Sequence, residues 1–200
     1  MAPALRVVVL LVVATMAGCG SDSSEPASKS RTHQSSGTAA APAPKIVGRW
    51  ERVQTCQQLL VALKEAHLAA LAAGMLAEDW FSNATPRRIA RKPNPCSGTH
   101  PRRHSHFFTA DGKFGSVDDN NQQVDDDSYQ IVDRDTLRIG HGRFHYRIEG
   151  GKTLILRPVI TAAAREKARA QPGKFSEAGW QVAVTYMGLP WKRVSCDGWC

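Results

Sequence analysis

Two histidines and a group of aspartates form the pattern in this sequence that is best suited to metal chemistry. His104 and His106 lie two residues apart in a strand-like run, so both side chains project from one face of the strand. An aspartate-rich segment follows across one turn and contains Asp118 and Asp125. Two imidazoles and a carboxylate suit zinc or another transition ion. These four residues are therefore the candidate metal ligands.

A structural interpretation of the same residues competes with the metal site and is favoured here. The histidines would be partly buried polar residues, and the aspartates would form turns in a solvated loop. The aspartate run also lacks the order and the closing Glu of an EF-hand. We therefore expect no cofactor, and the sequence predicts no catalytic residue. Acid–base chemistry by Asp125 or Asp127 with a histidine stays open as an alternative.

Known catalytic sequence patterns give no support to an enzymatic function. The chain contains no Gly-x-Ser-x-Gly elbow, no Walker loop, no His-Glu-x-x-His and no Gly-x-Gly-x-x-Gly. A cysteine nucleophile is not expected either, because the cysteines of the folded region are predicted to be paired. The sequence thus favours a protein that is not an enzyme.

The N-terminal residues have the pattern of an export signal. Arg6 precedes an unbroken apolar run from Val7 to Ala14, which is too short for a membrane helix of about 20 residues. Met16-Ala17-Gly18-Cys19 resembles the bacterial lipobox, although leucine is commoner than methionine at the first position. The resemblance implies removal of residues 1–18 as a signal peptide and a diacylglycerol on Cys19. It also implies anchoring to a bacterial cell membrane on the extracytoplasmic face.

The segment after Cys19 has the composition of a tether. Residues 20–44 are rich in Ser, Ala, Pro and Thr and have no hydrophobic period, so they cannot bury enough apolar surface to fold. We therefore assign residues 19–44 to a lipidated, disordered tether and residues 45–200 to one domain. The formal net charge of +8 falls to +7 without Arg6, which favours contact with an anionic membrane surface. No nucleic-acid motif is present, so we expect no nucleic-acid partner.

Four cysteines remain in the predicted domain, and an even number in an oxidising compartment predicts two disulfides. The preferred pairing joins Cys56 to Cys96 and Cys196 to Cys200. A crossed pairing of the C-terminal cysteines with Cys56 or Cys96 is the alternative. A zinc site is not favoured, because the paired Cys-x-x-Cys spacing is missing.

Short strands with a period of two dominate the region from residue 104 to residue 156. The clearest is Arg143–Ile148, in which Phe144, Tyr146 and Ile148 alternate with polar residues. Asp111-Gly112 is a strong signal for a two-residue hairpin. Six such strands recur about every 8–12 residues, which indicates a meander that forms a sandwich or a small barrel. They are residues 104–109, 113–117, 129–132, 136–139, 143–148 and 153–156.

The segments around this meander complete the predicted architecture. A first strand covers residues 45–53, and residues 179–187 alternate in a way that predicts the last strand, which gives about eight strands. Thr55 and Gln58 predict a capped amphipathic helix that ends near Gly74, with His67 packed on its apolar side. Residues 161–170 predict a short helix. The fold class is therefore mainly β, with minor helix.

The first strand carries a resemblance to a known family of barrels. Gly48-Arg49-Trp50 is similar to the Gly-x-Trp motif that opens lipocalin-like barrels, and Arg193 matches the late arginine that stacks on that Trp. The resemblance implies a lipocalin-like barrel closed at its base by Gly48, Trp50 and Arg193. It implies a structural role for these residues and no activity.

Three functions remain open from the sequence. The leading hypothesis is a non-enzymatic binding module for a small apolar or amphipathic ligand or an envelope component, which a roomy apolar interior would favour. The second is a metal-dependent envelope enzyme that uses His104, His106 and a loop aspartate, which converging His and Asp side chains would favour. The third is a surface scaffold or inhibitor, which a filled barrel would favour. The sequence does not fix the oligomeric state.

Overall fold

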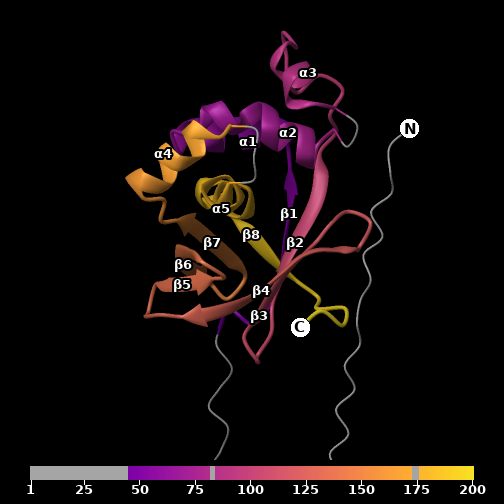
Figure 1. Cartoon of the computed structure of the whole chain (residues 1–200). Coiled ribbons are helices and arrows are strands. Elements are labelled where there is room, and N and C mark those ends of the chain that lie inside the picture. The colour runs from indigo at the N-terminus through magenta and orange to yellow at the C-terminus, as the bar shows by residue number, and fades with distance from the viewer. Residues whose placement is uncertain (1–44, 82–83, 173–175) are drawn as a thin grey trace, which may run out of the picture. The chain divides into compact units, whose positions relative to one another are not determined.

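Eight antiparallel strands close into one barrel in chain order. The computed structural model describes residues 45–81, 84–172 and 176–200, and Figure 1 shows the strands below a group of helices. The barrel closes because β1 pairs with both β2 and β8, which confirms the predicted lipocalin-like barrel. The strands are β1 (Gly48–Gln54), β2 (Arg102–Phe108), β3 (Lys113–Val117), β4 (Gln123–Ile131), β5 (Thr136–Ile139), β6 (Gly142–Glu149), β7 (Thr153–Pro158) and β8 (Trp191–Val194).

The alternation of apolar residues along the strands fills the barrel interior. On β6, Phe144 is fully buried and the flanking residues of the opposite face are exposed, as the sequence predicted. The predicted turn at Asp111-Gly112 is also present, with Gly112 at a φ of 88°, but the connection spans the four residues 109–112 instead of two. The interior core consists of Ile46, Trp50, Phe108, Phe114, Tyr129, Leu137, Ile139, Phe144, Leu154, Leu156, Val184 and Trp191.

The last predicted strand is wrong. Residues 179–187 belong largely to helix α5 (Glu177–Thr185), whose N-cap Ser176 accepts a hydrogen bond from the Gly179 amide. The buried positions of this helix recur every three or four residues, and this pattern overlaps with the alternation that suggested a strand. The eighth strand is instead β8, which the sequence analysis did not identify.

The first helix is confirmed at its start and differs at its end. Thr55 and Gln58 form the predicted reciprocal cap of α1 (Cys56–Glu65), with side-chain to amide distances of 3.1 and 3.0 Å. The helix stops at a left-handed residue, His67, whose side chain is exposed and not packed. A 3₁₀ turn (Ala69–Leu71) then leads into α2 (Ala72–Asp79), so Gly74 lies inside a helix and does not end one.

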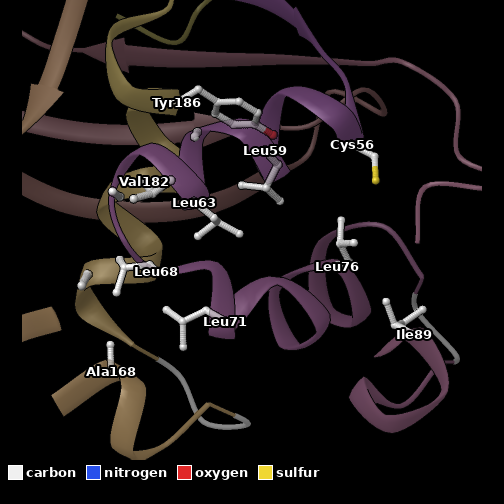
Figure 2. Packing of buried hydrophobic residues seen from close by; sticks show 13 residues of the cluster. Cys56, Leu59, Leu63, Leu68, Leu71, Leu76, Ile89, Ala168, Val182 and Tyr186 are labelled. Atoms are coloured by element: carbon white, nitrogen blue, oxygen red, sulfur yellow. The ribbon is translucent and has the colours of Figure 1, made fainter. Parts of the chain in front are cut away.

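The helices form their own core at one end of the barrel (Figures 1 and 2). Besides α1, α2 and α5, they include α3 (Pro86–Ala90) and the predicted α4 (Ala162–Ala170). Leucines of α1 and α2 pack with residues of α5 and the following turn, as Figure 2 shows. The buried members of this core are Cys56, Leu59, Ala62, Leu63, Ala66, Leu68, Leu71, Leu76, Ile89, Ala168, Ala178, Val182 and Tyr186.

Both favoured disulfides are present. Cys56 pairs with Cys96, which ties the start of α1 to the segment before β2, and Cys196 pairs with Cys200 in a short C-terminal loop. The Trp199 ring inside this loop packs against Phe107 on the outer face of β2, with ring centroids 5.4 Å apart. The loop therefore covers an apolar side chain that would otherwise face solvent.

The base of the barrel, opposite the helices, has the arrangement that the Gly-x-Trp resemblance implies. The Arg193 guanidinium lies 4.2 Å from the centre of the Trp50 ring and donates to the carbonyls of Val47 and Gly151. A Cβ on Gly48 would lie 2.5 Å from Nη1 of Arg193, so this position requires glycine. The Trp50 indole donates to the Ile46 carbonyl, and both groups are buried.

The predictions for residues 1–44, including the signal peptide, Cys19 and the tether, lie outside the described residues. Across the part of the chain that the structure describes, no helix combines the length and the apolar character that a membrane span requires.

Candidate ligand-binding site

A cavity of about 520 Å³, lined by both charged and aromatic side chains, opens at the helical end of the barrel. Its walls come from the ends of β1 to β4 nearest the helices, from the end of α2, and from α5 with the turn that follows it. The barrel interior below it is filled by the apolar core, so no roomy apolar interior is present among the described residues. The cavity has a size typical of small-molecule sites.

The four predicted metal-site residues come together at this cavity. His104, His106, Asp118 and Asp125 all line it. The three residues Asp125–Asp127 lie on β4 and not in a loop as the sequence suggested. They pair with Ser116, Gly115 and Phe114 of β3, in that order. Asp118 does lie in the connecting loop, and its carboxylate accepts the amides of Asn120 and Gln122 as a turn former does.

His106 is held by hydrogen bonds at both ring nitrogens. Its Nε2 lies 2.9 Å from the Val184 carbonyl, and its Nδ1 lies 2.8 Å from the Ser116 hydroxyl. Because a carbonyl only accepts, Nε2 carries the proton and Nδ1 accepts from the hydroxyl. The side chain is fully buried, and this burial lowers its pKa well below the usual value. His106 is thus a satisfied core histidine that joins β2, β3 and α5.

The geometry of these residues does not favour the predicted metal ligand set of His104, His106, Asp118 and Asp125. Neither nitrogen of His106 is free to bind an ion. Throughout residues 45–81, 84–172 and 176–200, no three His, Cys, Asp or Glu side chains are placed to share one metal ion. The residues that the sequence grouped do lie together, but hydrogen bonds to Ser116 and Val184 engage both ring nitrogens of His106, and the loop amides engage one carboxylate oxygen of Asp118.

His104 lies above His106 and is neutral at physiological pH. Burial, together with the positive charges of Arg52 and Arg102, lowers its pKa to about 4. Its ring meets the His106 ring edge-on at 5.1 Å. His104 therefore offers the cavity an uncharged imidazole, which acts as a hydrogen-bonding wall and not as a cation.

Two carboxyl groups in the cavity are poorly compensated. Burial and, to a smaller extent, the nearby Glu78 raise the pKa of Asp79, at the end of α2, to about 7, although Arg102 opposes this shift. Burial also raises the pKa of Asp125, although its Oδ2 accepts a hydrogen bond of 2.9 Å from the Trp180 indole. Arg102, on this rim, donates to the backbone carbonyl of Asp79 and pairs with Asp119 at 3.4 Å.

The cavity is acidic within a basic chain. Two arginines, Arg102 and Arg103, line it, and each pairs with a carboxylate that does not line it, Asp119 or Glu51. No described Lys, Arg or His side chain forms a salt bridge with any of the six lining carboxyl groups. Those six are Glu78, Asp79, Asp118, Asp125, Asp127 and Glu177.

Aromatic rings complete the walls. Trp80, Trp180 and Tyr186 line the cavity beside the carboxyl groups. Aromatic faces next to carboxylates are the surroundings that bind organic ammonium groups. The arrangement can therefore hold a cationic group by charge and by its contact with the rings.

Sequence reasoning did not find several of these residues. Asp79 ends an unremarkable helix, and nothing in the sequence places it beside β2. Trp180 was predicted to lie in a strand, so its position over the barrel mouth was not expected. The periodicity of α5 was the one available signal, because its apolar residues also fit a spacing of three and four.

Comparison with known proteins gave no relative: no family model matches the chain, and no curated protein sequence is similar to it.

Proposed function

We propose that this chain is a lipid-anchored protein of the bacterial cell envelope whose barrel is a non-enzymatic binding module. Its ligand is a small amphipathic molecule or envelope component that carries a positive charge. The ligand binds in the cavity at the barrel mouth, and the filled part of the barrel holds that site rigid.

One observation carries the proposal of a cationic ligand. Six carboxyl groups surround one cavity in a chain with a formal net charge of +8, and the described residues supply them with no salt bridge. Carboxylates grouped in a partly desolvated cavity repel one another, which favours binding of a positive charge. The three aromatic rings give such a ligand an apolar contact.

A second cavity supports an amphipathic ligand. It has about 340 Å³ and lies against α2 and α5, where Leu71, Met75 and Ala77 contribute apolar surface. Asp79 and Trp180 line both cavities. An ammonium group beside these carboxylates would thus have an apolar wall next to it for a hydrocarbon chain.

Binding of a simple alkylammonium ion tests this function. We expect n-butylamine to raise the melting temperature of the purified chain by several degrees when it is present at about 100 times its Kd. n-Butanol and butyrate, which have the same chain without the positive charge, should produce no shift. The double variant Asp79→Asn/Asp125→Asn should lose the shift. Equal shifts with all three compounds, or none with the amine, would refute the proposal.

Membrane attachment has its own test. Cys19→Ser removes the thiol that the lipobox resemblance assigns to lipid, and we expect this variant to leave the membrane fraction. A variant of another cysteine pair, Cys196→Ser/Cys200→Ser, should stay there. If the Cys19→Ser chain partitions as the parent does, the anchoring proposal fails while the binding proposal stands.

The other two functions receive less support. A metal-dependent enzyme that uses His104, His106 and an aspartate is disfavoured because both nitrogens of His106 are engaged. A scaffold or inhibitor with a filled barrel would leave the acidic cavity without a role. If neither amines nor metal ions bind, the scaffold becomes the better proposal.

A further inference from the structure

Arg52 is a buried cation near the mouth of the barrel. Its side chain is only 9% exposed. The guanidinium carbon lies 3.8 Å from the centre of the Tyr186 ring and 4.7 Å from that of the Trp191 ring. The two aromatic rings hold the group in place, but they satisfy none of its N–H donors.

The donors of Arg52 form no hydrogen bond of normal geometry among the described residues, although the Tyr186 hydroxyl lies near enough to raise the pKa of Arg52. All three guanidinium nitrogens are buried without a hydrogen-bond partner, and so is the indole nitrogen of Trp191. Burial lowers the pKa of Arg52 to about 10, so the group still carries its charge at physiological pH. A buried charge without a partner is strongly unfavourable, and several unsatisfied donors in one place form a site for an anion.

Arg49 shows how the same strand satisfies a buried arginine. It lies three residues earlier on β1, faces outward and is 5% exposed. Its nitrogens donate to the Ser105 hydroxyl at 3.0 Å and to Asp197 at 3.4 Å, and they lie 3.9 Å from Glu51. The lack of partners at Arg52 is therefore a property of its site and not of arginines in this strand.

The position of Arg52 links it to the cavity. Its register partner across β2 is His104, and the next inward residue on β1 is Gln54. Both residues line the cavity, as does Tyr186, on which Arg52 stacks. The guanidinium thus lies next to residues that line the cavity, although Arg52 itself does not line it. Access from the cavity to the guanidinium would require movement of side chains such as the half-buried His104, its register partner.

We propose that Arg52 and the indole N–H of Trp191 bind an anionic group of the same ligand whose ammonium group the acidic rim holds. The ligand is then a small zwitterion, with an ammonium group joined by a short chain to a carboxylate or a phosphate. This inference rests on the proposed function and specifies its ligand class. Charge-assisted hydrogen bonds to a guanidinium provide the binding energy.

Matched probes separate the two parts of this ligand. We would titrate the purified chain with ω-aminocarboxylates of two to six carbons, with O-phosphoethanolamine, and with alkylamines of the same lengths. At one chain length the zwitterion should bind roughly tenfold more tightly than the alkylamine, because it gains charge-assisted hydrogen bonds. A stronger effect with O-phosphoethanolamine would assign the site to a lipid headgroup. A stronger effect with an aminocarboxylate would assign it to an amino acid or a peptide end.

Variants of the two buried arginines form the control. Arg52→Met should remove the advantage of the zwitterion and leave alkylamine binding within about twofold of the parent. Arg52→Met should also keep or raise the melting temperature, because it removes an unpaired buried charge, whereas Arg49→Met should lower it. A merely structural Arg52 would give the opposite result, with a lower melting temperature and an unchanged zwitterion advantage. If Arg52→Met does not fold, Trp191→Phe serves as the second variant. It keeps an aromatic ring but lacks the N–H, so it should reduce the preference for the zwitterion over the alkylamine.

The outcomes distinguish the two proposals. Equal binding of zwitterions and alkylamines by the parent chain would overturn the role of Arg52 and leave the proposed function intact. Absence of binding by every amine would overturn both. A zwitterion advantage that disappears in Arg52→Met and persists in Arg49→Met is the result that we expect.

Discussion

Each end of this barrel holds an arginine stacked on a tryptophan, but the two arginines differ in their hydrogen bonds. At the base, Arg193 stacks on Trp50 and donates to backbone carbonyls. Near the mouth, Arg52 stacks on Trp191 and forms no hydrogen bond of normal geometry among the described residues. The base therefore stabilises the fold, whereas the mouth keeps polar groups whose burial without a partner is unfavourable.

Other polar side chains show a similar contrast. Near the base, Tyr129 completes the polar bonding of its hairpin by donating to the Thr109 carbonyl at 2.8 Å. At the mouth, burial raises the pKa of Asp79 and Asp125, so these groups are stabilised less in their charged form than in water. Unfavourable electrostatics confined to one cavity is the pattern that binding sites show.

The largest expected effect separates the two ends by stability. Trp50 is fully buried and Trp80 is half-buried at the cavity rim. We expect Trp50→Ala to lower the free energy of unfolding by about 3–5 kcal/mol and Trp80→Ala by about 1 kcal/mol. Urea denaturation measures both. Alkylamine binding should weaken in Trp80→Ala only, and equal losses of stability would contradict the assignment of the base as the stabilising end.

The disulfides give the next largest effect. The Cys56–Cys96 disulfide lies beside the mouth and joins residues 40 positions apart in the sequence. The Cys196–Cys200 disulfide joins residues only 4 positions apart. From loop closure entropy, replacing the first pair by alanine should cost about 4 kcal/mol and replacing the second about 2 kcal/mol. Thermal unfolding under non-reducing conditions measures the difference. A larger loss from the C-terminal pair would show that its packing through Trp199 matters more than the chain entropy.

A smaller, pH-dependent effect is expected at Asp79. Its folded-state pKa of about 7 lies above the usual value of 3.8, so the folded state keeps a proton that the unfolded chain has released. Stability from this group is complete below about pH 4 and falls as the pH rises to 7. Between pH 5 and 8, this group should lower the free energy of unfolding of the parent chain by about 2–3 kcal/mol, and Asp79→Asn should not show this decrease. Parallel pH profiles of parent and variant would contradict the raised pKa.

His104 provides an opposing trend that must be subtracted. Its folded-state pKa of about 4 lies below the usual 6.5, so the unfolded chain gains a proton first as the pH falls. Stability from this group is therefore complete above about pH 6.5 and falls towards pH 4. Measuring His104→Gln beside Asp79→Asn separates the two groups, because their effects have opposite signs.

Local patterns were sufficient to predict most of the fold. The cap at Thr55, the strands with a period of two and both disulfides depend on residues that are close in sequence or on simple cysteine counting. The Gly-x-Trp motif also predicted the stacking of Arg193 on Trp50. Prediction was wrong at residues 179–187, where a short apolar segment fits both periods, and only packing over the barrel mouth decides for a helix.

The site was less predictable because it depends on contacts between distant residues. Strand spacing placed His104 and His106 on one face correctly, and the hairpin brought Asp125 close to them. The sequence could not show that His106 contacts Val184, because the two residues are 78 positions apart. The Val184 carbonyl accepts a hydrogen bond from one ring nitrogen of His106, so that nitrogen is not available to a metal. The burial of Asp79 and Arg52 likewise follows only from the placement of α5 and the turn after it.

The central claim is that a cationic ligand binds at the mouth while the base stays unchanged, and the indole N–H signals of the five tryptophans report both ends in one spectrum. The Trp180 indole donates to Asp125 at the mouth, and the Trp50 indole donates to the Ile46 carbonyl at the base. Titration of the ¹⁵N-labelled chain with n-butylamine should move the Trp180 signal to saturation and leave the Trp50 signal in place. A Trp180 signal that does not move, or one that moves together with that of Trp50, would contradict the account.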